Sequence, residues 1–436
     1  MDALKHFPEE YARCFRPSFA LLNRYEKSFL TTYWRFFYII PMLLIFIISS
    51  MTHIVVLLMN KQMTDLAYLL PPLLVTVHAS LRSLVIIPQS TEITAIIKEL
   101  GELWRDIFTD TQNKEKNIQL KTVNFSNNAI YWVSILGSFQ YLSSPLLETL
   151  IRRYILKQDC ELLLPIACSY PFNPTANLFI YLAVYAFQFY TSEYENFKKN
   201  LIIFIFFSPV QSKDQLLDDR RCFDGLISAV VVTLLSAGSQ LIMITLCALL
   251  GTEFTILRED LYSMKPMLNG HMDREGYNNM KVFAQRHQKL IGLSRQLDEV
   301  FNPMVFVDLL FVGITTCAFR FAGEFARGPT YMINNYVAVA SSMCTVLYLC
   351  YYGERLTVAS ARIGDIAYQS RWLDADKQYK MTILLIIKIS QKPCCMTSLK
   401  YATVSLNMFT KVVSTTWSYF SLLNSVYKEE AEDSSQ

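Results

Sequence analysis

Residues 403–427 read TVSLNMFTKVVSTTWSYFSLLNSVY, and this stretch is long enough to cross a lipid bilayer as one helix. Polar side chains recur along it at steps of three or four residues, which places them on one helical face. They are Thr403, Asn407, Thr410, Ser414, Ser418, Ser421 and Ser425. Two interpretations stay open. Small polar residues allow close packing between membrane helices, and they equally suit a helix that borders a water-filled pore.

The composition of the whole chain indicates a membrane protein. Of its 436 residues, 52% are hydrophobic and only 18% are charged, whereas a soluble domain usually has about 25% charged residues. The net charge of +3 is too small to indicate a nucleic-acid partner. Of the five histidines, His53, His78, His271 and His287 have no metal-ligand spacing, and no glycine-rich phosphate loop is present. We therefore expect no enzymatic activity, no metal and no cofactor.

The apolar runs predict an all-α membrane protein with seven transmembrane helices. Clear spans of about 20 apolar residues are expected at 36–59, 66–87, 129–150, 302–322, 332–352 and 400–427. Two further runs, 177–207 and 223–251, flank a charged stretch. We count 177–251 as one net crossing that carries an unusual insert at 193–222. We have no physical account of what this insert does.

The distribution of basic residues predicts the orientation. With seven spans and the N-terminal segment 1–35 in the cytoplasm, the cytoplasmic segments carry 25 Lys and Arg residues and the external segments carry 6. Counting 177–207 and 223–251 as separate spans would move the basic segment 251–301 outside, against the positive-inside rule. We therefore expect a cytoplasmic N-terminus, an extracellular C-terminus and an external acidic tail at 428–436.

Two segments between spans predict a cytoplasmic helical anchor bundle. In 251–301, one helical stripe carries apolar residues at Phe283, Leu290, Leu293, Leu297 and Phe301. In 353–399, the run MTILLII is too short to span and predicts a buried cytosolic helix that ends before Pro393. Solvated loops with local amphipathic helices are the alternative.

The cysteines leave two questions open. Cys160 and Cys168 share one predicted external loop, as either a disulfide or two free thiols. Cys394 and Cys395 lie near the membrane and are candidates for acylation.

Several short motifs, taken in order, resemble the insect odorant receptor family. They are GERL at 353–356, Tyr368 with Trp372, Gln391-Lys392-Pro393, Thr403-Val404-Ser405-Leu406 with Phe409, the closing SYFSLLNSVY at 418–427, and the earlier PIACSYPFNP at 165–174. The resemblance covers essentially the whole chain. The chain departs from the family at 193–222, where the fourth helix is longer than usual.

The resemblance implies a ligand-gated, non-selective cation channel in the plasma membrane of sensory neuron dendrites. Odour-specific subunits of the family form hetero-tetramers with a shared odorant co-receptor, and their last helices line the pore. The family's gate matches Leu422, Ser425 and Val426 here, with Ser418 and Ser421 on the same pore-side helix. Apolar residues at such a constriction close a pore by dewetting.

The resemblance also implies a pocket for a small hydrophobic volatile in the outer half of the spans. Aromatic residues supply contact area there, and a Tyr, Ser or Asn supplies a hydrogen bond to the ligand. The matching positions are Tyr68, Phe139, Ser143, Phe179, Tyr185, Tyr331, Asn335 and Tyr336. We expect His78, midway through the second span, to be a hydrogen-bonded structural residue.

Two other classes remain as alternatives. A gustatory receptor of the same superfamily would carry a closing Thr-Tyr…Gln-Phe pattern, which is absent. A secondary transporter would show internal hydropathy repeats, and the sequence has none.

Overall fold

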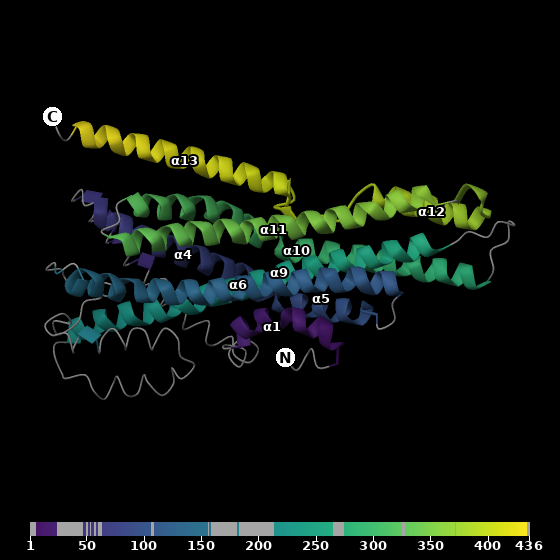
Figure 1. Ribbon diagram of the computed structural model, residues 1–436, viewed down its shortest axis with the longest axis horizontal. Helices are drawn as coiled ribbons and strands as arrows, with labels where there is room; N and C mark the ends of the chain where they lie inside the picture. The colour runs from purple at the N-terminus through teal and green to yellow at the C-terminus, as the bar shows by residue number, and fades with distance from the viewer. Residues whose placement is uncertain are drawn as a thin grey trace.

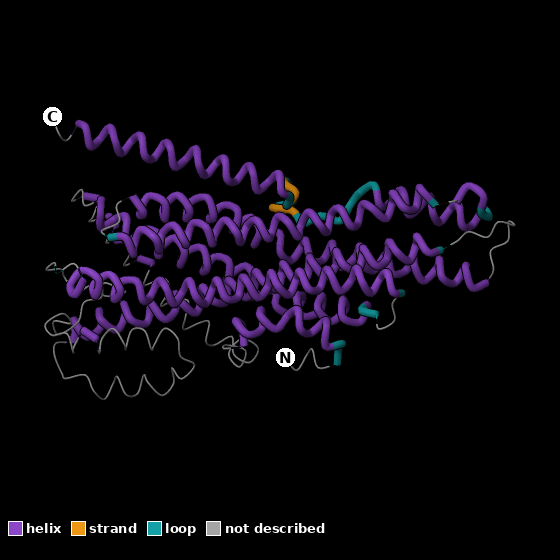
Figure 2. The backbone as a smooth tube through the Cα atoms, viewed as in Figure 1, coloured by secondary structure: helices purple, strands orange, loops and turns teal. Residues whose placement is uncertain are grey.

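The computed structural model describes residues 6–23, 47–48, 51–52, 54–55, 58–59, 63–105, 109–155, 157, 181–182, 213–264, 274–324, 328–370 and 372–433. Most of this described part is helical (Figure 2). The α-helices are α1 (Glu9–Asn23), α4 (Met63–Ile86), α5 (Ser90–Leu103), α6 (Asp110–Leu150), α9 (Lys213–Ser263), α10 (Arg274–Glu324), α11 (Pro329–Gln369), α12 (Lys377–Ser390) and α13 (Leu406–Asp433). Shorter elements are η2 (Ile87–Gln89), η3 (Ile151–Ile155), η4 (Trp372–Asp374), β1 (Thr397–Ser398) and β2 (Ala402–Thr403).

The long helices form an elongated bundle. Figure 1 shows α6, α9, α10 and α11 running along the long axis, with α1 on one side and α13 on the other. Helix α9 packs on α11, α4, α6 and α1, so it lies at the centre of the bundle. Its residues from Leu241 to Leu250 are all buried. A helix that is apolar and buried all round is expected only in such a central position.

Four helical stretches of the described part are long and apolar enough to cross a membrane. They are Leu69–Leu103, Ser236–Ser263, Gly276–Glu324 and Pro329–Gln369. These stretches contain the predicted spans 302–322 and 332–352 and most of 66–87 and 223–251, while 129–150 falls within α6. The expected span 36–59 is described only in fragments, and 177–207 lies outside the described residues except for 181–182. The count of seven spans and the orientation remain predictions.

The insert predicted at 193–222 is described only in its second part. Residues 213–222 form the first turns of α9, continuous with the rest of that helix, and 193–212 lie outside the described residues. Most of the predicted external loop 151–175, with Cys160 and Cys168, also lies outside them.

The boundary predicted for the last span was wrong. We expected a helix from residue 400, but residues 397–403 form a hairpin in which Thr397 pairs with Thr403. The backbone turns back at Leu399 and Lys400, whose φ angles are 47° and 61°. Helix α13 begins only at Leu406 and runs to Asp433, through much of the predicted tail at 428–436. Thr403 is therefore not part of the helical polar stripe.

The helices predicted for the two cytoplasmic segments are present, and their side of the membrane stays a prediction. All five apolar residues of the stripe in 281–301 are at most 3% exposed on α10. The run MTILLII lies in α12, where the carboxylate of Asp376 accepts a hydrogen bond from the Tyr379 N–H (3.1 Å) and caps the helix. Tyr379, Ile383 and Ile386 are buried on one face of α12. The opposite face exposes Met381, Leu384, Leu385 and Ile389, so the expected burial of this helix holds for one side only.

The acylation candidates Cys394 and Cys395 follow α12 and are partly buried. Burial raises the pKa of both thiols. This lowers the fraction of thiolate, which is the reactive form. The backbone N–H of Cys394 also donates to the hydroxyl of Ser360 (2.9 Å), which fixes this segment against α11. Acylation here remains a prediction that the surroundings of the thiols do not favour.

His287 lies in the buried stripe side of α10, between the rings of Phe254 and Phe283 (centroid distances 6.3 and 6.1 Å). It is 4% exposed, and burial lowers its pKa from 6.5 to about 4. The imidazole is therefore neutral in the folded protein at pH values where the unfolded chain already binds a proton.

We expect this histidine to make the protein less stable in acid. The contribution of neutral His287 to the free energy of unfolding is fully present above pH 6.5 and is lost as the pH falls toward 4. Between pH 8 and pH 5, the free energy of unfolding falls by about 2 kcal/mol through this group. The difference between the thermal unfolding midpoints of the detergent-solubilised protein at these two pH values measures the effect. His287→Gln removes the titrating group and should reduce this difference. An unchanged difference in the variant would show that other groups cause the acid sensitivity.

Candidate functional site

The last helix packs against the bundle with one narrow face. Thr416 and Phe420 are 7% and 8% exposed, and Met408 and Val412 are half-buried. This face lies against α10 and α11, where the thiol of Cys317 donates to the Thr416 carbonyl (3.4 Å). The side of α13 opposite the polar stripe is thus the side that packs against its own chain.

The polar stripe faces away from the rest of the chain. Its six helical members are all exposed: Asn407, Thr410, Ser414, Ser418, Ser421 and Ser425. Three of the hydroxyls donate to carbonyl groups of α13 itself, from Thr410 to Asn407, from Ser418 to Ser414 and from Ser425 to Leu422. Helix packing within the chain therefore does not account for the stripe. Contact with a second subunit or with an aqueous path remains as the explanation of the stripe.

The expected gate residues lie toward the C-terminal end of the same helix. Leu422 is 62% exposed and Ser425 is exposed, whereas the side chain of Val426 lies outside the described residues. Trp417 and Tyr419 are also more than 60% exposed. The large apolar side chains of this helix thus have surface left for contacts outside the chain.

Three of the expected ligand residues gather at the first turns of α11. Asn335 is 8% exposed and Tyr331 is half-buried. The guanidinium of Arg320, on α10, lies 5.1 Å from the ring centre of Tyr336 and 4.6 Å from that of Phe420. Arg320 therefore connects an expected ligand residue with the buried face of α13, and no pattern in the sequence distinguishes this arginine from others.

The other expected ligand residues are less informative. Phe139 is 47% exposed on α6, and the Ser143 hydroxyl donates to the Gln140 carbonyl of the same helix (3.2 Å). The side chain of Tyr68 lies outside the described residues, as do Phe179 and Tyr185. One pocket shared by all eight residues remains a prediction.

A buried ionic cluster joins α4, α9 and α10. The carboxylate of Asp308 lies 3.1 Å from Nη1 of Arg82 and 3.1 Å from Nε2 of His78, and Arg82 donates to the amide oxygen of Gln240 (2.9 Å). Arg82 and Asp308 are each only 2% exposed on their side chains. His78 also stacks on Phe311 (5.3 Å). It is the hydrogen-bonded structural histidine expected from the sequence.

Sequence reasoning missed the partners of His78. Arg82 lies in the predicted span 66–87 and Asp308 in 302–322, and an ionisable residue within a span is by itself a signal of function or of a buried pair. The two residues are far apart in the chain, so only the packing of α4 on α10 brings the charges together. Nε and Nη2 of Arg82 and Oδ2 of Asp308 have no hydrogen-bond partner among the described residues.

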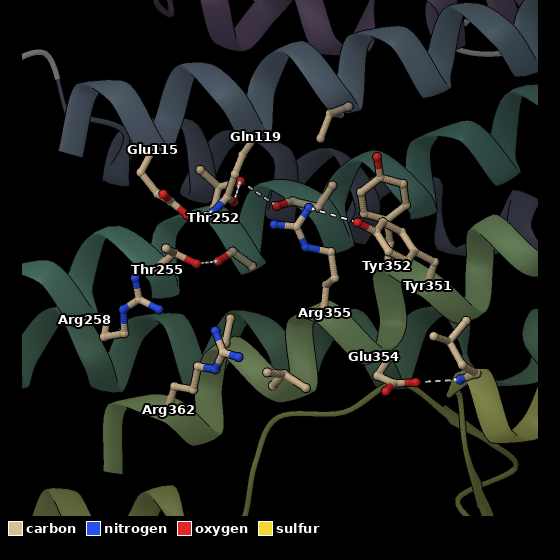
Figure 3. A pocket seen from close by; sticks show the side chains of 16 residues that line it. Glu115, Gln119, Thr252, Thr255, Arg258, Tyr351, Tyr352, Glu354, Arg355 and Arg362 are labelled. Atoms are coloured by element: carbon tan, nitrogen blue, oxygen red, sulfur yellow. Dashed lines mark hydrogen bonds between the residues drawn. The ribbon is translucent and has the colours of Figure 1, made fainter. Parts of the chain in front are cut away.

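A cavity of about 300 Å³ lies between α6, α9 and α11 and reaches the first residue of α13 (Figure 3). Its charged lining residues are Glu115, Arg258, Glu354, Arg355 and Arg362. Under the predicted topology, it lies at the cytoplasmic ends of the spans and not in their outer half. The sequence did not predict it.

Comparison with known proteins places this chain in a family. A profile described as 7tm Odorant receptor matches residues 62–197 and 225–417, which is most of the chain. The chain belongs to this odorant receptor family, whose members are receptors and not enzymes. This outcome decides against the gustatory receptor and the transporter. The match breaks at 198–224, within and just beyond the insert predicted at 193–222.

Three Drosophila melanogaster proteins illustrate the relationship. The chain is 26% identical to putative odorant receptor 92a over 43% of its own length and 45% of that protein. It is 28% identical to odorant receptor 13a over 35% of this chain and 39% of that one. With odorant receptor 67c, it shares 23% identity over 54% and 57% of the two chains. The chain thus spans about half the length of these curated relatives.

Solved structures agree on the fold. The insect olfactory receptor OR5 from Machilis hrabei superposes with a TM-score of 0.61 at 12% identity, covering 90% of each chain. The same receptor in complex with eugenol gives a TM-score of 0.66 at 11% identity, over 95% of this chain and 97% of the other. Because the identity is low, this similarity establishes the fold alone. The chain has the helical fold of these insect olfactory receptor structures.

Proposed function

We propose that this protein is an odour-specific receptor subunit that binds a small hydrophobic volatile and opens a cation-conducting pore together with the odorant co-receptor. The observation that carries the proposal is the exposed polar stripe of α13. Lipid would penalise these hydroxyl and amide groups, whereas a neighbouring subunit or water would not. A tetramer in the plasma membrane places such a stripe at the conduction path or beside it.

The ligand part of the proposal rests on the family and on the first turns of α11. The Machilis hrabei receptor was solved with eugenol, a small aromatic molecule. In this chain, Tyr331, Asn335 and Tyr336 offer aromatic surface and one amide in the region expected for the ligand. The contact between Arg320 and both Tyr336 and Phe420 gives this region a direct route to α13.

Patch-clamp recording tests the function as a whole. Cells that express this chain with the co-receptor are exposed to a broad odorant panel, and we expect ligand-evoked currents that need no G protein. Cells with the co-receptor alone and cells with this chain alone are the controls. Saturable uptake of a substrate without current, or a response that a G-protein inhibitor abolishes, would argue against the proposal.

The stripe itself gives a sharper prediction. Ser418→Leu with Ser421→Leu replaces two exposed hydroxyls by bulky apolar groups, and we expect the saturating current to fall at least tenfold because the path dewets. Thr415→Leu is the matched control. Thr415 is also exposed on α13, but it lies about 100° round the helix from Ser414. Surface biotinylation normalises the currents. Equal currents in the double variant and the control would show that the stripe does not border the conduction path.

A further inference from the structure

The cavity between α6, α9 and α11 is built from the ends of three helices that the predicted topology places in the cytoplasm. Its walls carry Glu115 and Gln119 from α6, Thr252 and Arg258 from α9, and the α11 segment from Tyr351 to Arg362. Figure 3 shows Arg355 and Arg362 reaching from α11 toward α9, on which Thr255 and Arg258 lie. Three guanidinium groups thus line one open cavity of about 300 Å³.

Two of the three arginines have no carboxylate partner among the residues that the structure describes. Arg355 lies over the ring of Tyr351 (5.7 Å to the centre) and donates weakly to its hydroxyl (3.5 Å). Arg362 makes no hydrogen bond or ion pair with any residue that the structure describes. Arg258 is paired with Glu259, the next residue along the helix (2.6 Å). The unpaired positive charge therefore belongs to α11.

The lining carries three guanidinium groups against two carboxylates, those of Glu115 and Glu354. Glu354 is already engaged, because its Oε2 accepts the backbone N–H of Leu406 (2.7 Å). Glu115 is the remaining carboxylate of the lining and projects from α6, on the opposite wall. A second cavity of about 400 Å³ shares Arg258 and Arg362 with the first and adds the carboxylates of Glu259 and Asp365. Arg355 and Arg362 are the two guanidinium groups left for an anion.

From these observations we infer that this cavity is a binding site for a phosphate-bearing anion, with Arg355 and Arg362 as its principal ligands. Guanidinium groups bind phosphate through paired, charge-assisted hydrogen bonds. Basic pockets between spans on the cytoplasmic side are a known setting for phosphorylated lipid headgroups. A soluble inositol phosphate offers the same chemistry. The position of this site at the inner leaflet rests on the orientation predicted from the basic residues. The binding of phosphate does not depend on that orientation.

The site borders the start of the last helix. Leu406 lines the cavity and is held by Glu354, the neighbour of Arg355 in the chain. An anion bound to Arg355 therefore sits one residue from the contact that fixes the first turn of α13. Occupancy of the site is expected to stabilise this contact.

The test measures binding and not current, so that it stands apart from the proposed channel function. The purified full-length protein is titrated in detergent micelles with fluorescent phosphatidylinositol bisphosphate. For Arg355→Gln with Arg362→Gln we expect the Kd to rise at least tenfold. The matched control, Arg295→Gln with Lys388→Gln, removes two exposed charges outside both cavities and should change the Kd less than twofold. Equal weakening in both pairs, or none in the first, overturns the site.

Two further arms complete the design. Soluble inositol trisphosphate that displaces the lipid probe near the probe's own Kd identifies a free phosphate as the ligand, while a requirement for a 100-fold excess identifies a lipid. If the first pair of substitutions prevents folding, Glu115→Gln takes its place. Removing the opposing carboxylate should then tighten binding at least threefold, and unchanged binding overturns the site.

Discussion

Gly353→Val is expected to abolish ligand-evoked current and to lower the thermal unfolding midpoint of the purified protein. A Cβ atom on Gly353 would lie 2.9 Å from Cγ1 of Val404 and 3.2 Å from its carbonyl oxygen. Val404 is 1% exposed and lies between the hairpin and α13, so it has little room to retreat. Overpacking of this kind costs about 1–3 kcal/mol, and here the strain falls on the segment that positions the last helix.

The surroundings of Gly353 explain why the effect should reach the pore. Tyr352, before it, hydrogen-bonds with Ser126 of α6 (3.0 Å), and Glu354, after it, holds the backbone of Leu406. Displacement of Val404 therefore disturbs both the packing of α11 on α6 and the position of the first turn of α13. Current at saturating ligand, normalised to surface protein, and the unfolding midpoint in detergent measure the two consequences.

Two further variants separate steric conflict from the loss of a glycine. Gly292→Val makes the same change on α10 at a position where an added Cβ meets nothing within 4 Å, and it should keep most of the current. Gly353→Ala combined with Val404→Ala removes the methyl group in conflict and should recover more current than Gly353→Ala alone. Equal effects at Gly353 and Gly292 would contradict the packing argument.

The helices with local periodicity could be predicted from the sequence. The stripe from Phe283 to Phe301 and the short helix α12 depend on apolar spacing within a few turns, which the sequence displays directly. The polar stripe of α13 was found in the same way. Only the structure shows that it faces outward, because the direction of a helical face depends on which side packs on α10 and α11.

The hairpin before α13 could not be predicted for two physical reasons. Leu399 and Lys400 adopt positive φ angles without the glycine or asparagine that usually signals such a turn. The hairpin is also held from a distant part of the chain, since the Asp298 carboxylate accepts from both the N–H and the hydroxyl of Thr397 (2.6 and 2.9 Å). Asn302 donates to the same hydroxyl. Contacts between residues almost 100 positions apart leave no local pattern.

The same limit applies to the charged groups of the bundle. The ionic cluster of Arg82 and Asp308 and the cavity lined by Arg355 and Arg362 each join helices that are far apart in the chain. Sequence spacing shows that a charge lies in or near a span, which is a reason to expect a partner. It does not identify the partner. The sequence likewise does not show which of the expected ligand residues share a pocket, because aromatic residues are common throughout these spans.

Arg286→Met is expected to lower the free energy of unfolding by about 3–5 kcal/mol, the usual cost of leaving one charge of a buried pair alone. Nη2 of Arg286 lies 2.6 Å from Oε2 of Glu253 and also donates to the Leu103 carbonyl at the end of α5. The Glu253 side chain is 0% exposed and that of Arg286 is 14% exposed. Without Arg286, the carboxylate on α9 would be buried without its countercharge, and α5, α9 and α10 would lose their shared contact. Chemical denaturation in detergent measures the loss.

A second substitution, at the partner residue, distinguishes the effect of an unpaired charge from the effect of a lost side chain. Adding Glu253→Leu to Arg286→Met removes the stranded carboxylate, and we expect the double variant to regain most of the stability, since apolar replacements of buried pairs are often neutral. Arg13→Met is the matched control, because the pair of Arg13 and Glu9 is exposed on α1 and should leave the denaturation midpoint unchanged. A double variant no more stable than Arg286→Met would show that packing of the arginine stem, and not its charge, joins the three helices.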